Sequence, residues 1–202
     1  KNPFTYSEFI GYYRCDNCGH VLAHPFEYPE YSEGYPYWYV DFYVQQGAGI
    51  DSMIRPLLKL DFSTDQFKSF LDVGCGFGFV VDYAEKFLGL GAVGVEPGFY
   101  GKEGEKILNI KIYKDYLENV EDLKEKKFDI IFSSAVIEHI INPLNFIKLL
   151  SGYLNDGGVL ILTTPNADYL LSESYKYSTL LGVLSLGFHV NLFTQKSMEI
   201  LL

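Results

Sequence analysis

The stretch Leu71-Asp72-Val73-Gly74-Cys75-Gly76-Phe77-Gly78 decides the fold of this 202-residue chain. It joins an apolar run over residues 70–73 to a loop that has glycine at every second position. Short continuous apolar runs are typical of buried strands in parallel sheets. Glycines directly after such a strand let the backbone turn sharply and approach a ligand, because no Cβ is in the way. The stretch therefore predicts a strand, a ligand-binding turn and then a helix over residues 79–88.

The same alternation of strand and helix continues along the chain. Further strands are predicted at 92–96, 110–113, 128–133 and 159–163, and helices at 50–58, 100–108, 117–126 and from Asn142-Pro143 to the turn at 155–158. Apolar strands that each lead into a helix predict an α/β fold with a doubly wound, mostly parallel sheet. Ligands bind such sheets beyond the carboxyl ends of the strands, so residues that follow strands are the candidate site residues.

Two regions of the chain differ in character. Residues 1–48 form a small irregular N-terminal segment, in which nine of the eighteen residues from Phe26 to Tyr43 are aromatic. Residues 49–202 carry the strand–helix pattern and are predicted to be the main domain. The aromatic segment is interpreted either as a cover over the neighbouring core or as a lid over a ligand pocket.

The composition limits the partners of the protein. With 16 basic and 26 acidic residues the formal net charge is −10, which argues against bulk attraction to nucleic acid or to an anionic membrane. The chain has three cysteines, Cys15, Cys18 and Cys75, too few for a secreted disulfide framework. We therefore expect a cytoplasmic protein with a small-molecule partner.

Four segments in order resemble class I S-adenosylmethionine-dependent methyltransferases of the small-molecule type. They are residues 71–78, Gly94-Val95-Glu96-Pro97, 128–139 and 157–166. The resemblance covers roughly residues 68–202 and implies a Rossmann-like methyltransferase fold with S-adenosyl-L-methionine as cofactor. Sheets of this family end in two further strands, so we expect this domain to lack its last strands. The exposed sheet edge would then favour a homo-oligomer.

The resemblance and the chemistry of the residues together give a set of cofactor-binding positions. Glu96 lies at the end of the second predicted strand, where a carboxylate can accept both ribose hydroxyls. Asp72 is interpreted either as a ligand of the methionine amine and organiser of the loop, or as an ordinary turn residue bonded to backbone amides. The full set is Asp72, Gly74, Cys75, Gly76, Gly78, Glu96, Pro97, Phe99, Asp115, Tyr116, Ser133, Ser134 and Ala135.

Within this set the resemblance implies different roles. Phe99 is expected to pack on the adenine, and Asp115 with Tyr116 to meet its amino edge. Ser133 to Ala135 are expected to line the pocket near the sulfonium. Cys75 is interpreted as a small residue without a redox or nucleophilic role.

A general base is needed only if the methyl acceptor must lose a proton. His139 is the first candidate for that catalytic role and His189 the second. For both histidines the alternative is a structural residue that satisfies a loop or caps a helix.

Cys15 and Cys18 form a CxxC pair, and two thiolates at this spacing can share one zinc ion. Zinc prefers four ligands, and the nearby candidates are His20 and His24. The alternative is a reduced cysteine pair in a relict zinc-ribbon hairpin.

Two other functions stay open at this stage. One is a nicotinamide-dependent oxidoreductase of similar architecture, against which Phe79 argues because it occupies the third glycine position of the dinucleotide fingerprint. The other is a non-catalytic cofactor- or zinc-binding module.

Overall fold

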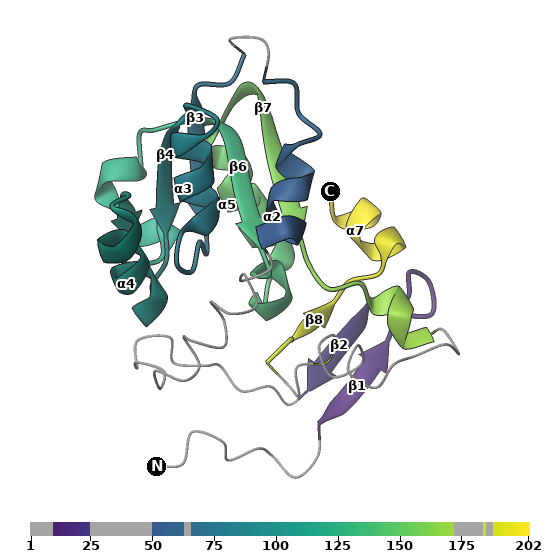
Figure 1. Ribbon diagram of the computed structural model, residues 1–202. Helices are drawn as coiled ribbons and strands as arrows, with labels where there is room; N and C mark the ends of the chain where they lie inside the picture. Colours follow the sequence, from purple (N-terminus) through teal and green to yellow (C-terminus); the bar gives the residue numbers. More distant parts are fainter. Residues whose placement is uncertain (1–9, 25–49, 63–65, 172–183, 185–187) are drawn as a thin grey trace, which may run out of the picture. The chain divides into compact units, whose positions relative to one another are not determined.

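The computed structural model describes residues 10–24, 50–62, 66–171, 184 and 188–202 (Figure 1). Contacts between Cα atoms divide the chain into two compact units. The larger unit includes the described residues 50–62, 66–134 and 148–163, and the smaller includes 10–24, 135–147, 164–171, 184 and 188–202. The predicted boundary near residue 48 and the segment Phe26–Tyr43 lie outside the described residues.

The larger unit contains a five-stranded parallel sheet. In the order of the sheet its strands are β5 (Ile112–Tyr113), β4 (Gly91–Val95), β3 (Ser69–Val73), β6 (Phe128–Ser134) and β7 (Leu154–Thr163). The chain runs outward from β3 to β5, and then returns to the other side of β3 through β6. The carboxyl ends of β3 and β6 therefore flank the point where the strand order reverses, and the predicted doubly wound parallel sheet is confirmed.

Helices cover this sheet and bury its apolar side chains. The described helices of the crossovers are α2 (Ile50–Leu57), α3 (Phe79–Lys86), α4 (Phe99–Leu108) and α5 (Pro143–Gly152). Leu57 and Val81, from α2 and α3, lie in one core cluster with Phe70 and Phe132 of the sheet, and all four are completely buried. Right-handed crossovers with this strand order place α5 on the face opposite to α3 and α4.

The predicted helix over residues 117–126 is wrong. The chain forms two short 3₁₀ helices there, η2 (Leu117–Asn119) and η3 (Glu121–Leu123). The buried residues of the segment are Leu117, Val120 and Leu123, at a strict spacing of three. Leu117 and Leu123 lie in the two 3₁₀ helices and Val120 lies between them in an extended conformation, so this spacing fits two short turns of three residues rather than one continuous α-helix with 3.6 residues per turn.

The predicted end of α5 is also wrong. The helix stops at Gly152, and β7 already begins at Leu154 rather than after the glycine pair. Phe128 donates its N–H to the carbonyl of Tyr153 at 2.8 Å, and Asn155 Nδ2 donates to Asp129 Oδ1 at 2.7 Å. These contacts draw the segment into the sheet, with a register irregularity between Phe128 and Ile130. A tertiary pairing thus overrides the local turn signal of the glycines.

The smaller unit brings segments from both ends of the sequence into one antiparallel sheet. Its strands are β1 (Gly11–Arg14), β2 (Val21–His24) and β8 (Asn191–Leu192), with β2 in the centre. Val21 and Leu192 pack with Ala167 of the 3₁₀ helix η5 (Ala167–Leu171) in a small core. The last helix, α7 (Gln195–Leu201), begins with a capping box in which Thr194 and Ser197 exchange hydrogen bonds.

Two surface predictions concern partners. Among the described residues β7 is an edge strand of the parallel sheet, as the homo-oligomer prediction requires, but the association itself stays a prediction. Within the same residues, none of the helices combines the length and the apolar character that crossing a bilayer demands.

Candidate functional site

The glycine loop follows β3 and begins a helix. Gly74, Gly76 and Gly78 have φ values of 76°, 54° and 78°, in the left-handed region that favours glycine. Gly74 and Cys75 both donate their N–H groups to the carbonyl of Val95, at 2.8 and 3.2 Å, and so tie the loop to β4. Gly78 is the N-cap residue of α3. The alternating glycines are therefore required by the path of the backbone.

Glu96 is the central carboxylate of the larger unit. It is buried, with 8% of its surface exposed, directly after β4. Its Oε2 accepts the N–H of Gly76 at 3.0 Å, and its Oε1 accepts the N–H of Gly98 at 2.7 Å. Burial raises the pKa of Glu96, while the bonds from Gly98 and Gly76 lower it. Since each carboxylate oxygen has two lone pairs, one on each oxygen is left for a ligand.

Asp72 lies in β3, beside β4, and is more deeply buried than Glu96, with 2% exposed. Burial raises its pKa well above the usual range, and the negative charge of Glu96 raises it further. Among the described residues, none donates a hydrogen bond to its carboxylate. Both interpretations of Asp72 stay predictions, and a buried acid without a donor in this part of the chain is a feature typical of ligand sites.

Cys75 packs away from the loop surface. Its Sγ would lie 2.5 Å from a Cβ placed on Gly94, so the thiol fills the space that this glycine leaves in β4. Burial raises the pKa of the Cys75 thiol well above the usual range, and the charges of Asp72 and Glu96 add to that effect. The thiol is therefore protonated and unreactive, in line with the interpretation of Cys75 as a small packing residue.

Two glycines of α4 belong to the same structure and were not identified from the sequence. A Cβ on Gly104 would lie 2.0 Å from the carbonyl oxygen of Phe77, and a Cβ on Gly101 would lie 2.9 Å from Cβ of Glu96. Backbone of α4 therefore touches the glycine loop directly. Their spacing of three residues on one helix face was the available signal.

The predicted adenine-side residues lie beyond β4 and β5. Phe99 is the first residue of α4 and is half-buried. Asp115 and Tyr116 are exposed. Asp115 Oδ1 accepts the N–H of Tyr116 at 2.7 Å and Nδ2 of Asn119 at 2.8 Å, and these bonds lower its pKa. Asp115 thus holds the turn before η2, and its contact with adenine stays a prediction.

The predicted sulfonium-side residues end β6. Ser133 is buried and donates its hydroxyl to the carbonyl of Val73 at 2.9 Å, which joins β6 to β3 at their carboxyl ends. Thr163 Oγ1 donates to Ser134 Oγ at 2.6 Å. Ala135 has a φ of 54°, a conformation that costs an L-residue about 1–2 kcal/mol. Such strain clusters at functional sites.

The two candidate bases meet in the smaller unit. His139 ends the 3₁₀ helix η4 (Ile137–His139), and its ring lies edge-to-face against His189, with 4.8 Å between ring centroids. His139 Nδ1 lies 2.8 Å from the carbonyl oxygen of Phe188. Because that oxygen only accepts, the ring donates through Nδ1, and burial lowers the pKa of His139 toward the neutral form. Nε2 then carries the lone pair that either a base or a ligand atom needs.

Glu138 completes this group and was missed at the sequence level. Ligand atoms of Glu138, His139 and His189 all lie within 4.8 Å of one another. Burial raises the pKa of Glu138 to about 7. His189 follows His139 by 50 residues, so no spacing rule in the sequence indicated this meeting.

The CxxC pair lies in the turn between β1 and β2. Cys15 is exposed, and hydrogen bonds from the backbone of Cys18 and Asn17 lower its pKa. His20 turns to Asn191, donating from Nε2 to Oδ1 at 2.9 Å, and its ring packs near Phe193. No set of three metal-binding groups that includes Cys15 or Cys18 exists in the described ranges. Cys15 and Cys18 would supply two of the four ligands that zinc prefers, and the zinc site stays a prediction.

A surface groove lies at the opposite end of the sheet. It is lined by the amino-terminal parts of β3, β4 and β6 together with Asn109, Lys111 and Lys127. Ligands of doubly wound sheets bind at the carboxyl ends of the strands, so this groove is not the expected cofactor site.

Comparison with known proteins decides the family. The model of the family described as "Methyltransferase domain" matches residues 47–202. The chain belongs to this family. The resemblance to class I methyltransferases is thereby confirmed, and the oxidoreductase alternative is dropped.

Similar methyltransferases differ in what they act on. The chain is 31% identical over 115 residues to the mitochondrial ubiquinone biosynthesis O-methyltransferase of Dictyostelium discoideum, covering 50% of this chain and 36% of that protein. It is 34% identical over 120 residues to the tRNA U34 carboxymethyltransferase of Campylobacter concisus, covering 55% of this chain and 42% of that protein. The structure of a plantazolicin methyltransferase in complex with a triazolic desmethylPZN analog and SAH matches this one with a TM-score of 0.55 and 25% identity. The match covers 67% of this chain and 54% of that chain. The chain thus spans about a third to a half of these proteins.

Because Gly104 lies so close to the glycine loop, we predict that adding one methyl group at this position destabilises the fold. We expect Gly104→Ala to lower the free energy of unfolding by about 1–3 kcal/mol, because its Cβ meets the backbone of Phe77 and neither side can move aside. Gly152→Ala, also in a helix but with open space around it, is the matched control and should be neutral or slightly stabilising. Urea unfolding measures both, and equal stabilities would contradict the close approach.

The burial of Asp72 predicts a pH-dependent cost to stability. Its raised pKa means that the folded state holds the proton more tightly than the unfolded state, whose pKa is about 3.9. The free energy of unfolding should therefore fall as pH rises from about 4 through the folded pKa. Asp72→Asn should be more stable than wild type at pH 8 and should lose this slope. Urea unfolding of wild type and Asp72→Asn at pH 5 and pH 8 tests this prediction, with exposed Asp156→Asn as control. If Asp72→Asn is less stable than wild type by the same amount at both pH values, the prediction is wrong.

Proposed function

We propose that this domain binds S-adenosyl-L-methionine at the carboxyl ends of β3 and β4 and transfers its methyl group to a small-molecule acceptor. The single observation that carries the proposal is the pair of buried carboxylates, Asp72 and Glu96, beside a loop of left-handed glycines. The family match and the similarity to an SAH-bound methyltransferase support it.

The residues fit the chemical parts of this cofactor. Each oxygen of Glu96 accepts one backbone N–H and keeps one lone pair, and vicinal ribose hydroxyls need two acceptors side by side. Asp72 accepts no hydrogen bond from the described residues, and an ammonium group would supply both donors and a compensating charge. A cation bound beside these two buried carboxyl groups would favour their ionised forms, so a sulfonium compound with an ammonium group suits the site.

The chemistry asks little of the protein beyond alignment. When bound, the cofactor supplies an activated methyl group for an in-line displacement. Gly76 and Gly98 hold Glu96, and the bond from Ser133 to the carbonyl of Val73 fixes the end of β6 against β3. Rigid positioning of this kind can contribute several kcal/mol to a two-partner reaction. Where the acceptor atom must lose a proton, the candidate base is the imidazole of His139, whose Nδ1 donates to the carbonyl oxygen of Phe188.

A small molecule is the acceptor class that the chain favours. Its net charge of −10 disfavours a polyanion such as tRNA, since binding phosphate backbones depends on basic residues. The similar proteins include enzymes named for ubiquinone biosynthesis and for tRNA, so charge is the discriminating feature.

The ribose role of Glu96 is tested by a thermodynamic cycle. We expect Glu96→Gln to weaken binding of S-adenosylhomocysteine by about 1.5–3 kcal/mol, roughly ten- to 150-fold, because a charge-assisted bond to a hydroxyl is lost. Calorimetry on wild type and variant is repeated with the 2′-deoxy analogue of the same ligand. Wild type should bind the 2′-deoxy analogue more weakly than S-adenosylhomocysteine, whereas Glu96→Gln should bind the two ligands with nearly equal affinity.

The cycle separates a ligand contact from a merely structural role, because Glu96 also supports the loop. If both proteins lose the same factor on removal of the 2′-hydroxyl, Glu96 does not contact the ribose. Exposed Glu118→Gln is the matched control and should bind like wild type.

Turnover tests the acceptor class and the alternative of a non-catalytic module. Release of S-adenosylhomocysteine is measured with phenols and catechols, with primary amines and with bulk tRNA as separate acceptors. We expect release with a small-molecule acceptor and none with tRNA, because the acidic surface repels the polyanion. Release with tRNA alone would contradict the proposed class, and tight cofactor binding without any turnover would favour the non-catalytic module.

A further inference from the structure

The smaller unit contains a second cluster of chemically capable side chains, distinct from the carboxylates of the larger unit. It consists of Glu138, His139 and His189, whose ligand atoms lie within 4.8 Å of one another. Glu138 has 1% of its surface exposed and His189 has 8%. His139 is half-buried. A buried acid such as Glu138 needs a physical reason, because an unpaired buried charge is costly.

One oxygen of this cluster has no partner. Glu138 Oε2 accepts the hydroxyl of Thr164 at 3.0 Å, whereas Oε1 is buried and has no hydrogen-bond partner within the ranges that the structure covers. An orphaned carboxylate oxygen beside two imidazoles is the arrangement that a cation satisfies.

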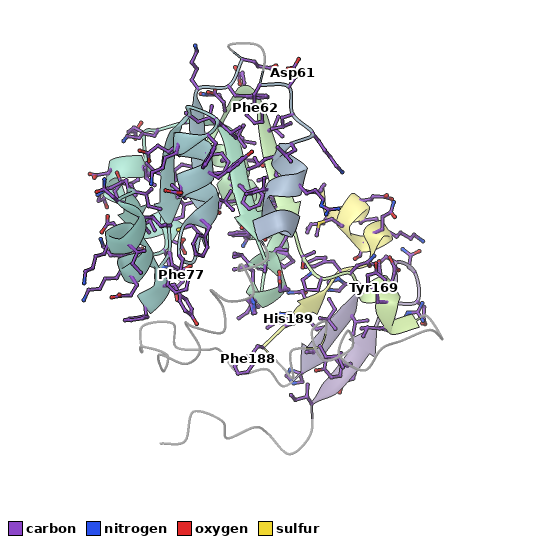
Figure 2. All side chains as sticks on the ribbon, in the orientation of Figure 1. Asp61, Phe62, Phe77, Tyr169, Phe188 and His189 are labelled. Atoms are coloured by element: carbon purple, nitrogen blue, oxygen red, sulfur yellow. The ribbon has the colours of Figure 1, made fainter. Side chains whose placement is uncertain are left out.

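The imidazole of His139 is held as metal-binding histidines are held. Its Nδ1 donates to the carbonyl oxygen of Phe188 at 2.8 Å, which leaves Nε2 with the lone pair. Metal-ligating histidines almost always donate their other ring N–H to a carbonyl or a carboxylate in this way. Thr164 plays the corresponding part for Glu138. Figure 2 labels Phe188 and His189 on the segment that leads into β8.

Hydrogen bonds join the two chain segments that carry the cluster. Val190 donates its N–H to the carbonyl of Glu138 at 2.8 Å, and Asn191 Nδ2 donates to the carbonyl of Ile140 at 2.6 Å. Together with the bond from His139 to Phe188, they join η4 to residues 188–191 at three successive points. The three groups are thus preorganised, which lowers the cost of binding an ion.

We propose that Glu138, His139 and His189 form a binding site for one divalent first-row transition-metal ion. Two imidazoles and one carboxylate suit Zn²⁺ and Co²⁺, and three protein ligands leave at least one coordination position for water or another oxygen ligand. In the ion-bound form the Nε2 lone pair of His139 is occupied, so His139 is then a ligand and not a base. This inference does not rest on the proposed methyl transfer.

The CxxC pair is a competing site in the same chain, so the experiment starts from the double variant Cys15→Ser/Cys18→Ser. We expect this 202-residue variant to bind one Zn²⁺ in calorimetry after chelator treatment. Addition of Glu138→Gln should weaken binding at least about tenfold, since loss even of an outer partner of a ligand costs 10–100-fold. Adding exposed Glu125→Gln instead is the matched control and should change nothing.

A second measurement covers the case in which Glu138→Gln does not fold. The Cys15→Ser/Cys18→Ser protein is titrated with Co²⁺, and we expect visible d–d absorption without a thiolate charge-transfer band. His189→Gln should weaken that spectrum and His24→Gln should not. Zn²⁺ binding that disappears with the two cysteines, or a Co²⁺ spectrum unchanged by His189→Gln, would overturn the proposal.

Discussion

The carboxylate of Glu96 connects the two loops on which the candidate cofactor site depends. One oxygen holds the N–H of Gly76, after β3, and the other holds the N–H of Gly98, after β4. Because both donors are backbone groups, the side chain fixes the path of the main chain itself. The glycine loop and the start of α4 are therefore held by one side chain.

Close packing of α4 also holds the glycine loop and Glu96 in place. α4 approaches the loop so closely that Gly104 leaves no room for a Cβ beside the carbonyl of Phe77, and Gly101 leaves little beside Glu96. On the sheet side, the thiol of Cys75 fills the space above Gly94. Small residues are therefore placed where three backbone segments converge.

The smaller unit shows a different principle, in which a site is assembled from distant parts of the chain. Glu138 and His139 follow β6, whereas His189 lies 50 residues later, and three hydrogen bonds, one between backbone groups and two from side chains to backbone carbonyls, join residues 138–140 to residues 188–191. The same unit joins β2, near the start, to β8, near the end. His20, a nearby candidate partner for the cysteine pair in the sequence, instead bonds to Asn191.

The sequence by itself determined the order of strands and helices, the glycine loop and the carboxylate at position 96, because these depend on local signals: apolar runs of strand length, positive φ angles that only glycine adopts readily, and a strand end followed by proline. It failed at residues 117–126, where the three-residue spacing of buried side chains selects 3₁₀ turns, and at 154–158, where pairing with β6 outweighs the turn tendency of two glycines. Only the tertiary structure decided which atoms meet: that Gly76 and Gly98 hold Glu96, that Gly104 touches the loop, and that Glu138, His139 and His189 come together. Contacts between residues far apart in the chain depend on how elements pack, and no local pattern of residues encodes them.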